Sequence, residues 1–342
     1  MDVDVDVDVV DARDERAFGE WFAAIEAGYA DLYPGESNWT LEELQALVLD
    51  PWGAHGRHFV FAARDGQGRV MGGGWMKLPE ADNRSMAELE VDVLPECHRR
   101  GVGTAVVAAM ERFAVAEGRK VAIGFQELPV EGPDRHREAR VFGEALGYEV
   151  AMVGIRRDLT LPPPDGRLDD LWEAGLPYAA DYEIVGWQGS TPDAFVEDRL
   201  TLNIRMSTDP PSGDLELETE HWDEARLRQS EALATAAGND IVTTGAVHRP
   251  SGRLVAYTMM RVNRDAPGKA HQWATIVLPE HRGHRLGILI KVANLRAVMA
   301  HSPATTRVMT FNAEENGPMV AVNEALGCTI RARELNWQKR LS

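Results

Sequence analysis

The feature that most constrains this chain is a short pattern that occurs twice. Pro-Glu followed by a basic, glycine-containing loop stands at 95–103 and again at 279–287. A second matching segment, Glu-Ala-Leu-Gly, follows each copy, at 144–147 and at 324–327. The first pair lies 184 residues apart and the second pair 180. Two landmarks in the same order at nearly the same spacing indicate an internal duplication into halves of about one domain each.

Composition limits the classes of protein that this chain can represent. Its 342 residues are 44% hydrophobic, which is enough for two cores, and it has no apolar run of the roughly 18 residues that a membrane span needs. Cys97 and Cys328 have no metal-ligand spacing, and no signal-peptide pattern opens the chain, so we expect a cytoplasmic protein without a metal. The net charge of −18 disfavours nucleic acid and membranes as partners and favours a cationic small molecule.

Each half is expected to be an α/β domain. In both halves, helices come first, followed by a strand meander, a strand–loop–helix unit, a strand–helix unit and a final strand. Three consecutive prolines at 162–164 cannot continue a strand or a helix, so they mark a linker. The sequence thus predicts a first domain over 1–160, a proline-rich linker over 161–177 and a second domain over 178–342.

The repeated loop is a candidate anion site. It enters a helix, whose first backbone N–H groups have no partner within the helix and lie at the positive end of the helix dipole. Glycine allows the loop backbone to approach a phosphate closely. A solvated basic turn without a ligand would have a similar sequence. The loop also lacks the Gly-Lys-Ser/Thr ending of a nucleotide P-loop and the third glycine of a dinucleotide-binding fold. Its strand–loop–helix context and its duplication favour the anion site.

The two loops resemble motif A of the GNAT superfamily of acyl-CoA-dependent N-acetyltransferases, in which Arg/Gln-x-x-Gly-x-Gly/Ala follows a strand. The family's next landmark is Asn-x-x-Ala-x-x-x-Tyr-x-x-x-Gly, and Asn316, Asn323 and Gly327 fall on its spacing. The resemblance covers nearly the whole chain and implies two tandem GNAT-like units, each a mixed, mostly antiparallel sheet flanked by helices. This arrangement is similar to that of mycothiol synthase and related actinobacterial two-domain proteins.

The resemblance also implies a cofactor site. In the family, backbone amides of motif A bind the pyrophosphate of CoA, and a backbone N–H of the preceding strand polarises the thioester carbonyl. On this basis acetyl-CoA would contact Val93, Arg100, Gly101, Val102, Gly103 and Thr104 in the first half, and Val277, Arg282, Gly283, His284, Arg285, Leu286, Gly287, Ile288, Asn312 and Asn316 in the second.

Neither half matches the family pattern completely. His98 stands at the first Arg/Gln position of motif A in the first half, and Arg285 replaces the first glycine in the second. The tyrosine that protonates the departing thiolate in the family is Gly143 in one half and Asn323 in the other. The first half has the better phosphate loop, whereas the second has the better arginine and asparagine set and is slightly favoured for CoA.

Four residues are candidate catalytic groups. Glu90 and Asp92 share one face of a strand and either could be the general base, although a solvated acidic face would show the same pattern. In the second half, Asn323 could hold a water molecule that replaces the missing tyrosine. The hydroxyl of Tyr257 could do the same, although such a residue is also typical of a core or a pocket wall.

These features favour an acetyl-CoA-dependent N-acetyltransferase that acts on a primary amine of a small cationic molecule, by direct attack on the thioester. The alternative is a non-catalytic acyl-CoA-binding or scaffolding protein with degenerate GNAT domains, in which the absence of both tyrosines reports lost chemistry. The sequence does not indicate the acceptor, because acceptor pockets are built from variable helices and loops. It does not indicate the oligomeric state either.

Overall fold

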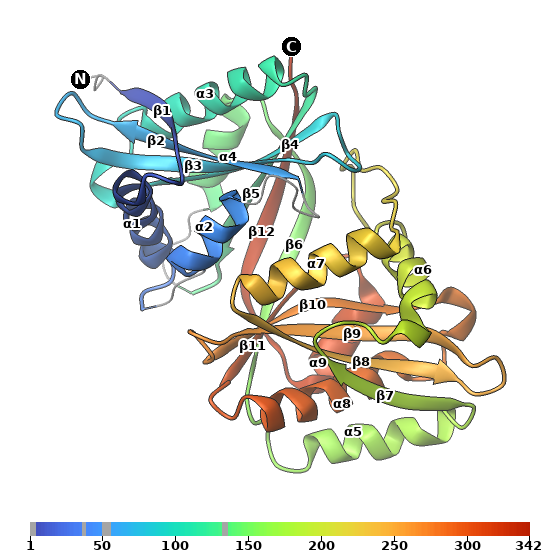
Figure 1. Cartoon of the computed structure of the whole chain (residues 1–342). Helices are drawn as coiled ribbons and strands as arrows, with labels where there is room; N and C mark the ends of the chain where they lie inside the picture. Colours follow the sequence, from blue (N-terminus) through green and yellow to red (C-terminus); the bar gives the residue numbers. More distant parts are fainter. Residues whose placement is uncertain (1–4, 36–38, 50–55, 132–135) are drawn as a thin grey trace. The chain divides into compact units, whose positions relative to one another are not determined.

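The computed structural model describes residues 5–35, 39–49, 56–131 and 136–342, and the chain divides into two compact units (Figure 1). The predicted α/β class, with mostly antiparallel strands flanked by helices, is confirmed. Among the helices described, none is long and apolar enough to cross a membrane. Unit 1 comprises Met1–Val153, Gly213–Leu217 and Arg333–Ser342, and unit 2 comprises Gly154–Ser212 and Glu218–Ala332.

Unit 1 is built on a sheet with the strand order β1-β2-β3-β4-β5-β12. Strands β1 to β4 pair antiparallel with their neighbours, whereas β4 and β5 run parallel. The elements are β1 (Asp6–Val10), α1 (Glu15–Leu32), α2 (Leu41–Leu49), β2 (Arg57–Arg64), β3 (Val70–Leu78), β4 (Met86–Val93), η1 (Pro95–Cys97), α3 (Val102–Ala116), β5 (Val121–Pro129) and α4 (His136–Ala145), with parts of β6 (Glu149–Thr160) and β12 (Thr329–Arg340).

The helices of unit 1 cover opposite faces of this sheet (Figure 1). Helix α3 buries an apolar stripe, Val102, Val106 and Met110, whose spacing of four residues places them on one helix face. Helix α1 buries Phe18 and Trp21 in a separate cluster on the other face, together with part of α2. The two faces of β4 therefore meet different environments, the α3 side and the α1 side.

Unit 2 repeats this plan with the strand order β6-β11-β10-β9-β8-β7. Helix α8 packs against the larger core cluster on one face, and α6 and α7 cover the other. The elements are α5 (Arg167–Gly175), η2 (Leu176–Tyr178), β7 (Tyr182–Gln188), η3 (Asp193–Phe195), α6 (Val196–Met206), α7 (Glu224–Ala236), β8 (Asn239–His248), β9 (Arg253–Asn263), β10 (Lys269–Val277), η4 (Pro279–His281), α8 (Leu286–His301), β11 (Arg307–Ala313) and α9 (Gly317–Leu326).

Each unit is completed by a strand from the other half of the sequence. In unit 2, the end of β6 pairs antiparallel with β11, from Gly154 opposite Ala313 to Thr160 opposite Arg307. In unit 1, the residues of β12 from Arg333 onward belong to the sheet beside β5. The boundaries predicted from the repeat, 1–160 and 178–342, therefore differ from those of the compact units.

The segment that was expected to be a linker, 161–177, is partly helical. Residues Arg167–Gly175 form α5, which packs against α8 in unit 2. The packing is close, since a Cβ atom at Gly175 would lie 2.8 Å from a methyl carbon of Leu289. Only the proline-containing stretch before α5 keeps the irregular conformation that the sequence indicates.

The strand exchange predicts that neither half of the sequence folds well alone. A fragment of residues 1–164 lacks Leu335 and Trp337, which are buried in the core of unit 1, and we expect it to lose cooperative thermal unfolding followed by circular dichroism. Joining residues 333–342 to this fragment through a flexible linker should restore cooperativity. A fragment 1–164 that melts as cooperatively as the extended one would contradict the exchange.

Candidate active site

The parallel strands β4 and β5 of unit 1 pair over only part of their length. The register runs from Met86 opposite Val121 to Leu89 opposite Gly124, after which β4 continues to Val93 and β5 to Pro129. In unit 2, the pairing of β10 with β11 stops even earlier, after three residue pairs. Backbone groups beyond the paired region need other partners, so this end of each strand pair is suited to bind a ligand through its backbone.

The free backbone side of β4 can be assigned at its last residue. The N–H of Leu94 donates to Met71 of β3 at 3.0 Å, so the preceding N–H, of Val93, is directed to the side from which β5 diverges. The same holds in unit 2, where Leu278 donates to Val255 at 3.0 Å and Val277 precedes it. The two backbone N–H groups that the family resemblance singles out thus face the diverging strands.

The first residue of each motif-A loop forms a hydrogen bond with the equivalent backbone carbonyl of its own unit, at the end of the preceding strand. His98 Nε2 lies 2.8 Å from the carbonyl oxygen of Val93, and Arg282 Nε donates to that of Val277 at 3.1 Å. His98 is a donor here when its proton is on Nε2. The histidine that departs from the family pattern therefore has the same positioning contact as the arginine that agrees with it.

The two loops also share an unusual backbone conformation. In the first half, Arg99 and Gly101 have φ angles of 63° and 83°, and in the second, Gly283 and Arg285 have 86° and 56°. Each loop thus needs two left-handed residues, and each supplies one glycine and one arginine in opposite order. Arg285 keeps the loop geometry although it replaces a glycine, at the cost of strain that glycine avoids.

The side chains of the second loop are already engaged within unit 2. Arg282 Nη2 donates to Asp209 at 2.5 Å, and His284 Nδ1 lies 3.1 Å from the carbonyl oxygen of Tyr178. The guanidinium of Arg285 lies 5.5 Å from the ring centroid of the same tyrosine. These contacts direct the positive charge of the second loop toward protein groups.

The first loop leaves more of its charge exposed to solvent. Arg100 is exposed, and Arg99 reaches only Glu138, at 3.8 Å and with both side chains largely exposed. Gly103 allows a close approach at the start of α3, because a Cβ atom there would lie 3.2 Å from the ring of Phe142. The backbone N–H groups at the start of α3 are thus accompanied by exposed arginines, as a phosphate site requires.

Gly143 stands at the position of the family's tyrosine, and in unit 1 the side chain of Trp337 fills the space beside it. A Cβ atom on Gly143 would lie 2.9 Å from three ring atoms of Trp337, which is buried and donates from Nε1 to Gln126 at 3.2 Å. The first half of the sequence does not contain Trp337, which reaches unit 1 with the exchanged strand β12.

The acidic residues of β4 lie on its α1 side. Asp92 is opposite Gly73 and Glu90 opposite Trp75 in the antiparallel register with β3. A Cβ atom on Gly28 of α1 would lie 3.1 Å from Cβ of Asp92, so the helix approaches this strand closely. The two candidate bases are therefore beside the diverging end of β4 and not on a freely solvated face.

Four carboxyl groups gather at this end of the sheet. Burial, with Asp92 and Glu334 among its charged neighbours, raises the pKa of Glu90 to about 8. Burial likewise raises the pKa of Asp92 to about 7, with Glu26 adding to the effect, and that of Glu334 to about 7, with Glu127 adding to it. Groups with pKa values close to neutrality are suited to accept a proton at physiological pH.

Glu90 and Asp92 were predicted from the sequence, whereas Glu127 and Glu334 were not. Glu127 lies on β5 beyond the paired region and accepts a hydrogen bond of 2.5 Å from the hydroxyl of Tyr33. Glu334 lies on β12, where Asn336 donates to it at 3.1 Å. Nothing in the sequence near the first motif-A loop points to a residue more than two hundred positions away.

The equivalent strand of unit 2 has no carboxylate on the corresponding face. At the offset of 184 residues, Ala274 and Ile276 stand where β4 has Glu90 and Asp92, and both are buried. Tyr257, opposite Ile276 in the register, is buried with them. Its hydroxyl donates to Asn203 at 2.9 Å, so this candidate acid is held in a packed cluster.

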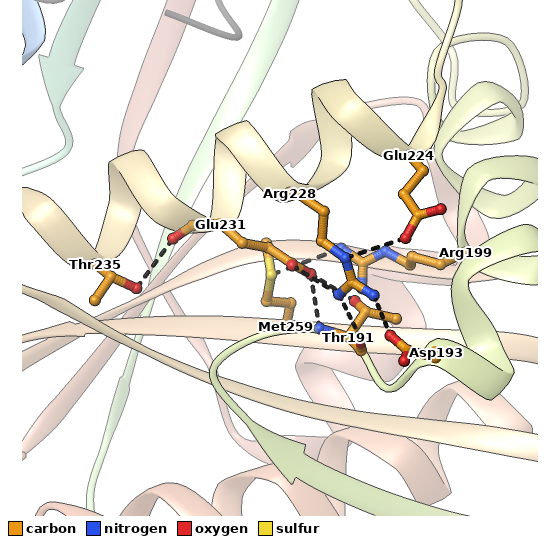
Figure 2. Close-up of polar contacts among 8 residues, drawn as sticks. All are labelled: Thr191, Asp193, Arg199, Glu224, Arg228, Glu231, Thr235 and Met259. Carbon is orange, nitrogen blue, oxygen red and sulfur yellow. Dashed lines mark hydrogen bonds and ion pairs between the residues drawn. The ribbon is translucent and has the colours of Figure 1, made fainter.

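A polar network fastens the helices over this face of unit 2, as Figure 2 shows. Arg228 of α7 donates to Asp193 at 2.6 Å and to the carbonyl oxygen of Thr191 at 2.5 Å. Glu231 accepts from both the N–H and the hydroxyl of Thr191, at 2.8 and 2.7 Å. Beneath them, Arg199 contacts the sulfur of Met259 at 3.7 Å. In unit 2, these contacts hold the covering segments against the sheet face that corresponds to the acidic face of unit 1.

The asparagines predicted to serve the second half lie in two separate places in unit 2. Asn323 is fully buried and donates to Asn312 at 3.1 Å, so the structure brings these two together. Asn316 instead caps α9, where its side-chain oxygen accepts from the N–H of Met319 at 3.3 Å. Sequence reasoning missed Lys291, which donates to Asn323 at 2.8 Å, because it lies in an otherwise apolar helical run.

Comparisons with known proteins agree with this geometry. Residues 22–148 match the model of the Acetyltransferase (GNAT) family. A mycothiol acetyltransferase from Frankia alni is 34% identical over 118 residues, or 32% of this chain and 33% of that protein, so the match spans about a third of its length. A solved tandem GNAT protein from the clavulanic acid biosynthesis pathway is 28% identical, with 99% of both chains covered and a TM-score of 0.80. A GCN5-related N-acetyltransferase from Sphaerobacter thermophilus is alike in fold, at 14% identity, a TM-score of 0.63 and coverage of 98% and 96%.

The loop geometry predicts opposite effects of two substitutions on stability. Arg285→Gly removes a strained left-handed residue and should raise the free energy of unfolding by up to about 1 kcal/mol, whereas Gly101→Ala should lower it by roughly the same amount. A Cβ atom at Gly101 would touch nothing, so its effect reports the backbone alone. Urea denaturation measures both, and a destabilised Arg285→Gly variant would show that side-chain contacts outweigh the strain.

Proposed function

We propose that this chain is an enzyme of the GNAT family, and that its unit 1 transfers an acetyl group from acetyl-CoA to a primary amine of a small cationic molecule. The observation that carries the proposal is the pairing of two features on β4. Glu90 and Asp92, with their raised pKa values, lie beside the point where β4 and β5 diverge, and the same strand leads into the motif-A loop. Unit 2 has such a loop but no carboxylate on the matching strand face.

The residues of unit 1 fit acetyl-CoA, which supplies an activated acyl group when bound. The backbone N–H groups from Gly101 to Thr104 hold its pyrophosphate at the start of α3, and Arg100 adds positive charge. The N–H of Val93 stabilises the negative charge that develops on the carbonyl oxygen. Assignment to unit 1 is supported by its exposed loop arginines and by the family match over 22–148, and it reverses the slight preference for the second half.

The acceptor amine reacts only after it has lost a proton. Glu90 takes that proton from the ammonium group, directly or through water, and the freed electron pair attacks the acyl carbon. A half-buried carboxyl with a pKa of about 8 accepts a proton more readily than an ordinary glutamate would. The carbon–sulfur bond then breaks and CoA leaves as the thiolate, which a thiol pKa of about 8.5 permits without a tyrosine at position 143. The remaining extra proton on the attacking nitrogen passes to this thiolate, directly or through water, so that the products are the neutral amide and the CoA thiol.

The charge of the site supports a cationic acceptor. Glu90, Asp92, Glu127 and Glu334 come from three strands that are consecutive in unit 1, and their mutual repulsion is among the causes of the raised pKa values. A bound ammonium group relieves that repulsion. The overall charge of −18 also attracts cations to the protein.

The second candidate function, a non-catalytic acyl-CoA-binding protein, is favoured by the absence of tyrosine at both family positions. Release of CoA thiol in the presence of a panel of primary amines separates the two. An active parent supports the enzyme. A parent that binds acetyl-CoA but releases no CoA with any amine supports the binding protein.

Glu90→Gln should lower kcat by about 100-fold, because general-base catalysis contributes at least that much, with little change in the KM for acetyl-CoA. In the parent, the rate should rise with pH around 8, as Glu90 ionises, and this limb should be lost in the variant. Glu144→Gln, at an exposed position, is the control. An unchanged rate and pH profile in Glu90→Gln and Asp92→Asn would remove this strand face from the mechanism.

The assignment to unit 1 can be tested at two equivalent glycines. Gly103→Val places a side chain against Phe142 at the start of α3 and should weaken acetyl-CoA binding at least tenfold in calorimetric titration. Gly287→Val is the matched change in unit 2, where a Cβ atom would meet only Val322, at 3.9 Å, and should leave binding unchanged. The reverse pattern would move the cofactor to unit 2.

A further inference from the structure

Unit 2 buries two neighbouring cations, and among the described residues no carboxylate lies within ion-pair distance of either. Lys291 on α8 is 2% exposed and Arg157 on β6 is 4% exposed. Within the ranges of the chain that the structure describes, neither forms an ion pair. The contrast with Arg119 in unit 1 is clear, since that equally buried arginine donates to Glu80 at 2.6 Å.

The two cations are linked by uncharged amides. Lys291 donates to the side-chain oxygen of Asn323 at 2.8 Å and lies 3.9 Å from the sulfur of Met319. Asn323 in turn donates to Asn312, whose oxygen also accepts from Nη1 of Arg157, both at 3.1 Å. Amide oxygens satisfy individual N–H donors, but they supply no negative charge.

Burying a charge without a partner of opposite sign is energetically unfavourable, and the lowered pKa of Lys291 reflects this. Burial lowers the pKa of Lys291 to about 8, and a value of 8 still leaves most of the side chain charged at pH 7. A buried charge without its partner is strongly destabilising, and both Lys291 and Arg157 lack a carboxylate partner among the described residues. Two such cations close together favour the binding of an anion, which would offset the cost of burying their charges.

Among the described residues, Asp158 and Cys328 lie close to this pair of cations, but the carboxylate of Asp158 is shared by Arg156, at 3.4 Å, and Arg307, at 3.5 Å. The thiol of Cys328 interacts electrostatically with both Lys291 and Arg157, which places it near both. Burial nevertheless raises the pKa of the Cys328 thiol, so it is uncharged at neutral pH. Neither group therefore balances the charges of Lys291 and Arg157, and an anion from outside the chain can do so.

We propose that unit 2 binds a small carboxylate between Lys291 and Arg157. Nη1 of Arg157 is used by Asn312, so the edge formed by Nε and Nη2 remains, and this edge matches the two oxygens of a planar carboxylate. The ammonium group of Lys291 supplies the second positive charge. The site is separate from the acetyl-transfer site in unit 1 and does not depend on it.

The test is carboxylate-dependent stability. The melting temperature of the full chain should rise with millimolar acetate or succinate, beyond the effect of chloride or sulfate at the same ionic strength. Lys291→Met and Arg157→Met should abolish this rise. Lys339→Met is the control, because Lys339 pairs with Glu111 in unit 1, and its response to carboxylate should equal that of the parent. No rise in the parent, or an equal rise with chloride, would overturn the proposal.

A second variant covers the case in which the first two fold poorly. Asn323→Asp is nearly isosteric and places a carboxylate on the atom that already lies 2.8 Å from Nζ of Lys291. This internal anion should replace the external one, so the variant should lose at least tenfold in succinate affinity by calorimetric titration. Undiminished succinate affinity in Asn323→Asp would show that the anion binds elsewhere and would contradict the proposal.

Discussion

The candidate active site of unit 1 depends on the place where two parallel strands stop sharing hydrogen bonds. Because β5 leaves β4 after Leu89, the N–H of Val93 is free to meet a ligand, and the side chains of Glu90 and Asp92 are brought to the same end of the sheet. Pairing between β3 and β4 continues to Val93 and holds the strand in place. The motif-A loop and α3 follow directly, so the candidate phosphate site and the candidate base are set by one strand.

The duplication shows which parts of this arrangement are structural and which are chemical. Both halves keep the left-handed pair in the loop, with glycine and arginine exchanged between its two positions, and both tie the loop back to the strand-end carbonyl through residue 98 or 282. The strand faces, by contrast, have diverged completely. Unit 1 retains acids beside the diverging strands, whereas unit 2 has apolar residues covered by helices and a separate pair of buried cations.

Much of what is local could be predicted from the sequence, although the helix α5 stands in the segment predicted to be a linker. The loops, the helices that follow them, the alternation that puts Glu90 and Asp92 on one face, and the α/β class all depend on neighbouring residues. The sequence could not predict Trp337 or Glu334, because they reach unit 1 only through strand exchange, and the repeat itself suggested that each half was self-contained. It could not predict Lys291 either, since one lysine in a helix is usually at the surface, and only packing shows that its ammonium group is buried.

The exchanged strands also affect how the protein is made. Residues 1–153 of unit 1 leave the ribosome first, but the part of β12 that completes its sheet begins at Arg333, after the whole of unit 2. At roughly 5–20 residues per second, the 179 intervening residues, 154–332, take about 10–40 s to synthesise. During that time the first unit exists without Glu334 and Trp337, and its open sheet edge is exposed to wrong partners. Translation order therefore makes the candidate active site one of the last parts of the molecule to form, so that a nascent chain acquires it only when nearly all of its length has been read.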